Sequence, residues 1–291
     1  MTVTIDALYT VILGFFTLLG FGLSTLSYKY FETYSKNLTV VSFIYFSLFW
    51  ISLFPYYVFE TRSIVYGVLI GLGVPFVLYI AIQYYRNPDR YKTMESIVTA
   101  IFIASVLYAP FEFYEPLKQA SIEFVSYQSY QVIQLLGIES NLTIGPNGFR
   151  SSFSFPQSDG TTIQSYVEPA CTGIGSMSIV VGLISITKSK LSHKLMLSVI
   201  FVSIIHILNI GRNVLIAVGY GKQLFQIQPE LLASLLGYQS TQMVSFFIAD
   251  KVISQLLSAI VLILLIYSLT LLIPSFKQQL IDFTDEWLPI S

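Results

Sequence analysis

Residues 195–220 read LMLSVIFVSIIHILNIGRNVLIAVGY and carry a single formal charge, Arg212. A helix rises about 1.5 Å per residue, so this run is long enough to cross the roughly 30 Å hydrocarbon core of a bilayer. Comparable apolar runs occupy residues 7–27, 38–59, 64–85, 97–114 and 244–273, and a shorter uncharged run occupies residues 171–187. The pattern predicts an all-α polytopic membrane protein with about seven transmembrane helices.

The composition agrees with this class and argues against others. Of the 291 residues, 54% are hydrophobic and 11% charged, and the mean hydropathy is +0.71. A net charge of −1 offers no basic surface, so no nucleic-acid partner is expected. One cysteine excludes an internal disulfide, and with only two histidines we expect no metal site and no cofactor. The first residues lack a basic segment, so no cleavable signal peptide is expected.

Basic residues alternate between the loops, and this bias sets the expected orientation. The richer side carries Lys29, Lys36, Arg86, Arg90, Lys92, Lys188, Lys190, Lys194 and Lys277. The other side carries Arg62, Lys118, Arg150 and Lys222. The richer side is expected to be cytoplasmic, which places the N-terminus outside and the C-terminus in the cytoplasm.

Two stretches interrupt the transmembrane pattern. Residues 117–138 mix apolar and polar side chains, which predicts an amphipathic helix at the outer interface or an extension of the fourth helix. Residues 139–169 are polar, and alternation at 152–155 and 162–167 predicts a strand or hairpin in a small outer insert. A further outer loop at 221–240 contains Pro229 and is expected to hold a short helix.

The chain is therefore expected to divide into three parts. Residues 1–116 would form four transmembrane helices, and residues 117–170 an interfacial helix and extracytoplasmic insert. Residues 171–291 would form a three-helix catalytic half with a cytoplasmic C-terminal tail.

Two cations fall inside predicted spans. Arg212 and Lys251 lie about eight and ten residues from the outer ends of their helices, roughly 12–15 Å deep. A charge there costs about 2.5–3.5 kcal/mol on insertion scales, so each needs a partner or a wet cavity and is a candidate functional residue. The alternative is an ion pair with Asp250 that only locks helices together.

The cysteine lies in Glu168-Pro-Ala-Cys171-Thr-Gly-Ile-Gly175. We expect Cys171 to open a helix at the outer boundary, where the helix dipole would lower the thiol pKa and favour the nucleophilic thiolate. The alternative is a small, buried thiol that behaves as an apolar side chain.

Polar residues line one face of the helix that carries Arg212. At 100° per residue His206, Asn209 and Asn213 share this face, and Arg212 borders it. His206 is a candidate proton shuttle or supporting residue, with a packing role as the alternative, and Asp250 is expected to neutralise Arg212 or Lys251. A thiolate beside cations suits acyl transfer through a thioester, with Arg212 or Lys251 stabilising the oxyanion.

At these residues the sequence resembles the archaeosortase/exosortase family of membrane enzymes. The resemblance rests on Glu168-Pro-Ala-Cys171-Thr-Gly-Ile, on Asn209-Ile-Gly-Arg212-Asn213, and on a basic residue in the next helix. It covers residues 168 to about 255 and implies a cysteine transpeptidase. Such an enzyme cleaves the C-terminal sorting signal of secreted proteins, which is a short motif, a transmembrane helix and a basic tail, and transfers them to a lipid-derived acceptor.

The resemblance also implies roles for single residues. Cys171 matches the nucleophile, and Arg212 matches the family arginine. Lys251 is the best match to the third position, which is usually Arg or His in the family, with Asp250 and His206 as alternatives for that role. Glu168 belongs to the motif and would support the site. The implied location is an archaeal cell membrane, with the active site on the extracytoplasmic side.

Three other functions remain open from the residues alone. An anion transporter or channel would be lined by Arg212 and Lys251, although the sequence shows no inverted repeat. A lipid-modifying acyltransferase or hydrolase would use the same cysteine. A structural assembly subunit would need no chemistry at all.

Overall fold

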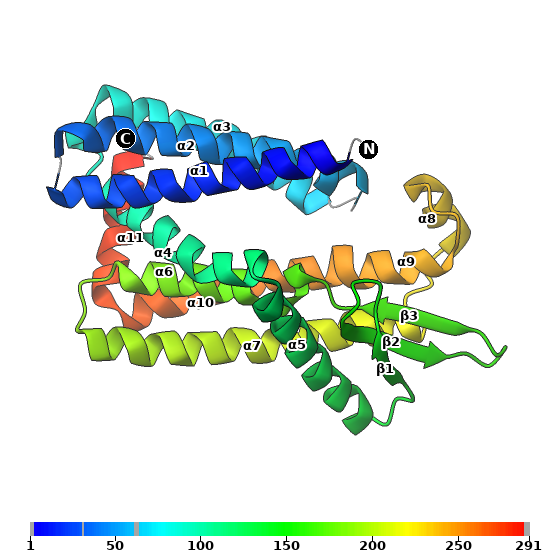
Figure 1. The fold of residues 1–291 in the computed structure, drawn as a ribbon. Helices are drawn as coiled ribbons and strands as arrows, with labels where there is room; N and C mark the ends of the chain where they lie inside the picture. The colour runs from blue at the N-terminus through cyan, green and yellow to red at the C-terminus, as the bar shows by residue number, and fades with distance from the viewer. Residues whose placement is uncertain (1–2, 31, 61–63, 288–291) are drawn as a thin grey trace. The chain divides into compact units, whose positions relative to one another are not determined.

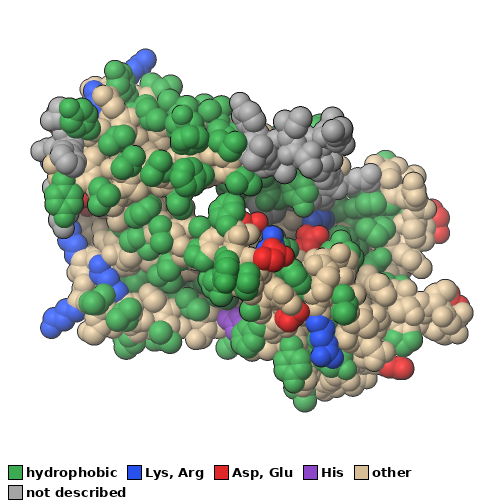
Figure 2. Space-filling view, in the orientation of Figure 1, with side chains coloured by type: hydrophobic (Ala, Val, Ile, Leu, Met, Phe, Trp, Pro, Cys, Tyr) green, Lys and Arg blue, Asp and Glu red, His purple; other side chains and the backbone are tan. Residues whose placement is uncertain are grey.

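The computed structural model describes residues 3–30, 32–60 and 64–287, which are mostly helical (Figure 1). Six helical stretches are long and apolar enough to cross a membrane: Thr10–Tyr28, Tyr34–Phe59, Gly67–Arg86, Met94–Phe113, Leu191–Gly221 and Gln242–Leu272. Hydrophobic side chains cover much of the face shown in Figure 2. The prediction of a polytopic helical membrane protein is confirmed. The orientation stays a prediction, and Arg62 lies outside the described residues.

The seventh apolar run forms a shorter helix than the others. Helix α6 (Ile174–Ser185) has 12 residues, or about 18 Å of rise, against a hydrocarbon core of roughly 30 Å. A complete crossing by residues 171–187 therefore stays a prediction.

The chain folds into two compact units. The first comprises residues 1–106, 179–197 and 267–291, and the second comprises residues 107–178 and 198–266. Several helices contribute to both units, because α4 (Met94–Phe113), α6, α7 (Leu191–Gly221) and α10 (Gln255–Leu272) each cross a boundary. The three-part division expected from the sequence follows chain order and stays a prediction.

The first unit is built on helices that pack through aromatic side chains. It contains α1 (Val3–Tyr30), α2 (Glu32–Pro55) with a π turn η1 (Tyr56–Glu60), α3 (Ile64–Arg86), η2 (Pro88–Arg90), part of α4 (Met94–Phe113) and α11 (Pro274–Trp287). The rings of Tyr91 and Trp287 stack at 4.0 Å, and Glu286 accepts hydrogen bonds from the backbone and hydroxyl of Thr93. These contacts hold the C-terminal helix to the loop before α4.

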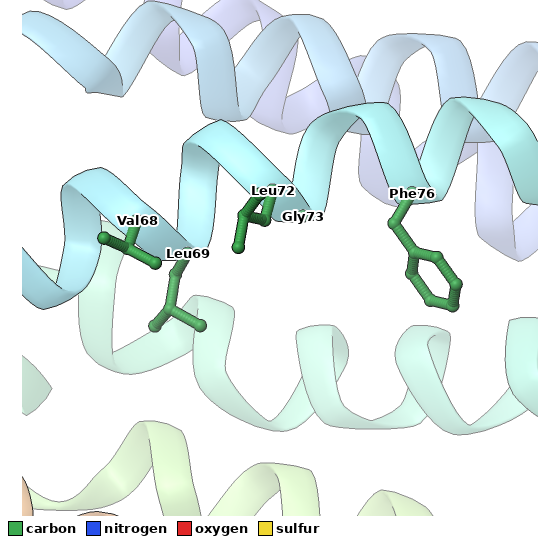
Figure 3. Close-up of a pocket in the computed structure, with 5 residues that line it drawn as sticks. All are labelled: Val68, Leu69, Leu72, Gly73 and Phe76. Atoms are coloured by element: carbon green, nitrogen blue, oxygen red, sulfur yellow. The ribbon is translucent and has the colours of Figure 1, made fainter.

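A shallow apolar hollow lies on α3 (Figure 3). It is lined by Val68, Leu69, Leu72, Gly73 and Phe76, all on one helix. Because all the lining side chains are apolar and come from one helix, the hollow suits contact with lipid chains. It has no polar group that could orient a substrate.

In the second unit the end of α4 is followed by a separate helix, α5 (Glu115–Leu135). Tyr114 is extended, with φ −105° and ψ 103°, and Pro116 follows in the first turn of α5. Tyr114 is the N-cap of α5, and Pro116 has no N–H with which to continue the hydrogen-bond ladder of α4, so α4 ends here. The alternative that residues 117–138 extend the fourth helix is therefore wrong.

Helix α5 covers one face of a three-stranded antiparallel sheet, ordered β1-β2-β3. The strands are β1 (Asn141–Ile144), β2 (Arg150–Pro156) and β3 (Thr162–Tyr166), so the predicted hairpin is confirmed. The two turns contain Gly148 and Gly160 at φ +78° and +82°, values that favour glycine. The shared core contains Ile122, Val125, Ile133, Phe153, Phe155, Val167, Val214 and Ala217.

The remaining helices of this unit are α7 (Leu191–Gly221), which begins in the first unit, α8 (Pro229–Leu236), α9 (Gln242–Phe246) and α10 (Gln255–Leu272). Helix α8 is the short helix expected at residues 221–240. Between α9 and α10 the backbone is π-helical over η4 (Phe247–Ser254), which the apolar run 244–273 did not predict.

Candidate active site

Cys171 lies in a 3₁₀ turn, η3 (Pro169–Thr172), that links β3 to α6. Its N–H donates to the Glu168 carbonyl at 2.8 Å, and the Thr172 hydroxyl donates to the Pro169 carbonyl at 2.8 Å. Gly173 follows in the left-handed region with φ +79°, so helix α6 begins only at Ile174. The expectation that Cys171 opens a helix is therefore wrong, because a left-handed residue separates the thiol from the first helical turn.

Two asparagines of α7 hold the backbone of Cys171. The side-chain amides of Asn209 and Asn213 donate to its carbonyl at 2.7 and 2.9 Å. They are four residues apart, so they lie on one face of the helix and reach the same oxygen. Both are buried, and together they satisfy both lone pairs of a carbonyl that the short turn leaves without a helical partner.

Gly173 lets this contact form. A Cβ added at Gly173 would lie 2.9 Å from Cγ of Asn209 and 3.1 Å from its amide nitrogen. The turn and α7 thus approach each other more closely than a side chain at this position would allow.

Arg212 makes two directed contacts with the π-helical segment. Its Nη2 lies 3.0 Å from Oδ1 of Asp250, and its Nε donates to the Ser254 hydroxyl at 2.5 Å. Lys251 Nζ lies 2.8 Å from Oδ2 of the same carboxylate. Asp250 therefore bridges both cations, whereas the sequence predicted that it would neutralise one or the other.

The carboxylate that bridges the two cations lies in the π-helical segment. Asp250 and Lys251 are adjacent in sequence, and on a regular helix their side chains would diverge by about 100°. Single π turns inside α-helices are rare and occur frequently at functional sites. Asp250 and Ser254 lie one turn apart here, which matches the spacing of the two Arg212 donors that they bind.

The electrostatics of the thiol differ from the expectation. Cys171 lies outside the six candidate spans and is partly exposed. Burial raises the pKa of the Cys171 thiol, the Arg212 charge lowers it, and the charges of Asp250 and Glu168 raise it. The raised pKa, rather than the lowered one expected at a helix N-terminus, keeps a larger fraction of the resting thiol protonated.

His206 faces α5. Its Nε2 lies 2.7 Å from Oε1 of Gln128, and its ring stacks on Phe124 with centroids 5.7 Å apart and an interplanar angle of 15°. Both contacts are with residues of α5. They account for a polar side chain at position 206 of α7 even if His206 takes no part in the chemistry. The Glu168 side chain is exposed, and the residue touches Cys171 through its backbone carbonyl.

The structure thus brings Asn209 and Asn213 to Cys171, and Arg212 and Lys251 to Asp250, within one compact unit. Sequence reasoning missed Ser254 and Gln128. Ser254 follows Asp250 by four residues, which is a usable signal once Arg212 is known to need a second acceptor. Gln128 carried no such signal, because it is one of several polar residues on α5.

The known proteins that this chain resembles all belong to one family of membrane proteins. The family model for transmembrane exosortases matches residues 10–230. Archaeosortase A of Natronomonas pharaonis is 34% identical over 264 residues, which cover 88% of this chain and 80% of that protein. Archaeosortase A of Haloferax volcanii is 30% identical over 257 residues, covering 85% of this chain and 84% of that protein. No solved structure matches the chain.

Proposed function

The chain belongs to the exosortase and archaeosortase family of membrane proteins, and on this premise we propose that it is a membrane cysteine transpeptidase. It cleaves the C-terminal sorting signal of secreted proteins and transfers their new C-terminus to a lipid-derived acceptor. The observation that carries the proposal is the Cys171 turn, whose backbone is held by Asn209 and Asn213, while the charge of the intervening Arg212 lowers the pKa of its thiol.

In the first half-reaction the Cys171 sulfur attacks the carbonyl carbon of the scissile peptide bond. The thiol proton passes to the leaving amine, the C–N bond breaks, and an acyl thioester remains on Cys171. In the second half-reaction a nucleophilic group of the acceptor attacks the thioester carbonyl, forms the new acyl bond, and gives its proton to the departing Cys171 sulfur. No oxidant or metal is needed, because each half-reaction exchanges one bond to the acyl carbon.

Arg212 is proposed to stabilise the negative charge that develops on the carbonyl oxygen. Its guanidinium is already oriented by Asp250 and Ser254, so little reorganisation is needed during reaction. Asp250 is proposed as a positioning residue, and Lys251 as the cation that balances the second oxygen of this carboxylate. His206 is proposed to support the packing of α7 on α5, since its contacts are with Gln128 and Phe124.

The transporter alternative is less well supported. An anion path needs cationic side chains that are free to exchange partners with the moving ion. Arg212 and Lys251 both pair with Asp250, and their side chains are only 25% and 17% exposed. The clustered charges also leave Cys171 and its two asparagines without a role in transport.

The location proposed for this chemistry is the extracytoplasmic side of an archaeal cell membrane. Support comes from the relatives in Natronomonas pharaonis and Haloferax volcanii and from the loop-charge bias, which assigns the insert at residues 117–170 to the outside.

Co-expression with a secreted protein that ends in a transmembrane helix and a basic tail tests the function. Cys171→Ala should leave the enzyme in the membrane at the wild-type level and abolish processing of that protein. Full processing by Cys171→Ala would rule out the peptidase. A transporter would keep its flux in Cys171→Ala and lose it in Arg212→Ala.

A further inference from the structure

The outer edge of β3 carries backbone groups that no other strand uses. The Val167 N–H donates to the Ser151 carbonyl at 2.9 Å, and bonded pairs alternate with non-bonded pairs along an antiparallel ladder. The odd-numbered residues of β3 therefore bond to β2, and Thr162, Gln164 and Tyr166 direct their N–H and C=O groups to the open edge. Within the described residues, β3 is the last strand on this side of the sheet.

The two edges of the sheet differ. The register of β1 on β2 shifts between Thr143 and Ile144, and such a bulge bends a strand and hinders further pairing. The register of β3 on β2 runs without a shift from Thr162 to Tyr166. Its sequence, TIQSY, contains none of the lysines or prolines that commonly protect an exposed edge. The β3 edge is thus the one suited to accept another extended chain.

This edge leads to the thiol. Tyr166 is the last residue of β3, and the chain reaches Cys171 through only four intervening residues. The negative charges of Glu168 and Cys171 both raise the pKa of the Tyr166 phenol, after the larger effect of burial, so the three side chains lie within electrostatic reach of one another. A chain added along β3 would arrive beside the Cys171 turn.

We propose that the outer edge of β3 binds the extended segment of the protein substrate that precedes its transmembrane helix, as an added strand next to Cys171. The inference rests on the proposed function and specifies how the substrate is held. Main-chain hydrogen bonds supply affinity, and the exposed side chains of Gln164 and Tyr166 contact alternate residues of the substrate.

Disulfide trapping tests the strand directly, because the chain has one cysteine. The double variant Cys171→Ala, Gln164→Cys carries a single thiol on the β3 edge and cannot turn over. It is co-expressed with a surface protein whose processing requires the wild-type chain. Single cysteines are placed, one at a time, at six successive positions before the transmembrane helix of that protein. The control enzyme is Cys171→Ala, Leu135→Cys, since Leu135 is 86% exposed at the end of α5.

Mild oxidation should give disulfides that alternate with period two along the substrate, because successive side chains of a strand point to opposite faces. The yield should exceed that of the Leu135→Cys control several-fold. Equal yields at all six positions, yields no higher than the control, or no disulfide would each overturn the added strand.

A second experiment uses the active enzyme. Gln164→Pro removes an N–H that points away from β2, a position where edge strands tolerate proline, whereas Gln164→Ala keeps the N–H and removes only the side chain. Proline should raise KM for the same protein roughly two- to tenfold, with the rate of Cys171 labelling by a thiol reagent unchanged as the check on folding. Equal KM values for the alanine and proline variants would contradict the proposal.

The two proposals can fail separately. Processing that persists in Cys171→Ala would sink the transpeptidase, whatever the disulfide pattern. Loss of processing in Cys171→Ala, together with a flat disulfide pattern, would leave the transpeptidase standing and remove the added strand.

Discussion

The side-chain amide of Asn209 donates a 2.7 Å hydrogen bond to the backbone carbonyl of Cys171. Asn213 donates to the same oxygen at 2.9 Å, so the turn that carries the thiol is fixed to α7 by two side chains. Arg212 lies between these asparagines in the sequence and is fixed to the following helix by Asp250 and Ser254. Three neighbouring residues of α7 therefore connect the turn that carries the thiol to the segment that orients the guanidinium.

Asn209→Ala and Asn213→Ala should each reduce the rate of substrate processing. Each removes one of two hydrogen bonds to the Cys171 carbonyl, worth about 0.5–1.5 kcal/mol, or roughly two- to tenfold in rate if the loss falls on the transition state. The double variant leaves the carbonyl unsatisfied and should lose more than the product of the two single losses. Strictly multiplicative losses would show that the two amides do not share one acceptor.

Gly173→Ala should disrupt the site, and Gly175→Ala should not. The first substitution puts a Cβ 2.9 Å from Cγ of Asn209 on a residue with φ +79°, whereas the nearest atom to a Cβ at Gly175 is 3.9 Å away. Strain of this kind costs about 1–3 kcal/mol. Both variants are compared with the wild type by their processing rate and by thermal unfolding in detergent. Wild-type activity and stability in Gly173→Ala would contradict the close approach of the turn to α7.

Arg212→Ala should abolish processing without unfolding the protein. Asp250 keeps Lys251 as a partner at 2.8 Å, so no carboxylate is left unpaired. Asp250→Ala removes the partner of both cations, and breaking such a partly buried pair costs about 3–5 kcal/mol, so this variant should lose folded protein as well as activity.

His206→Ala is the matched control for Arg212→Ala on the same helix. It should retain processing, because the His206 contacts are with α5. If Arg212→Ala and His206→Ala lost the same amount of stability and kept the same residual activity, the ion pairs of Asp250 would serve only to hold the helices together.

Labelling of Cys171 by a membrane-impermeant thiol reagent should increase with pH. The thiolate is the reactive form, and burial raises the pKa of this thiol, so the labelling rate at neutral pH should be below that of a free cysteine and rise about tenfold per pH unit below the pKa. Arg212 lowers this pKa, so Arg212→Ala should label more slowly at a fixed pH. The reagent should act from outside the cell, and labelling only from the cytoplasmic side would overturn the expected orientation.

Much of the fold was predictable because its signals are periodic or long. The six candidate spans follow from apolar runs with few charges, and the β2–β3 hairpin follows from alternation at residues 152–155 and 162–167. Strand β1 escaped prediction because Asn141–Ile144 is largely exposed on both faces, which leaves no alternation. The π-helical segment was not predicted, because a turn that contains one extra residue leaves no signal in the composition of the apolar run.

The site was predictable in its members and less so in its geometry. Charge inside a span identified Arg212, Lys251 and Asp250, and the polar face of α7 identified Asn209 and Asn213. The pKa of Cys171 was predicted in the wrong direction because burial of the thiol, which raises the pKa, outweighs the effect of Arg212, which lowers it. The start of the helix was also misplaced, since it was expected at the cysteine. The left-handed Gly173 delays that helix to Ile174, and the Thr-Gly sequence after the cysteine was the available signal.

The most direct measurement of the central claim is mass spectrometry of the peptide containing Cys171 after an acid quench during turnover. An acyl group from the substrate is expected on this sulfur, released by hydroxylamine and missing from Cys171→Ala. Product that accumulates while Cys171 stays unmodified, under a quench in which a synthetic thioester survives, would contradict that claim.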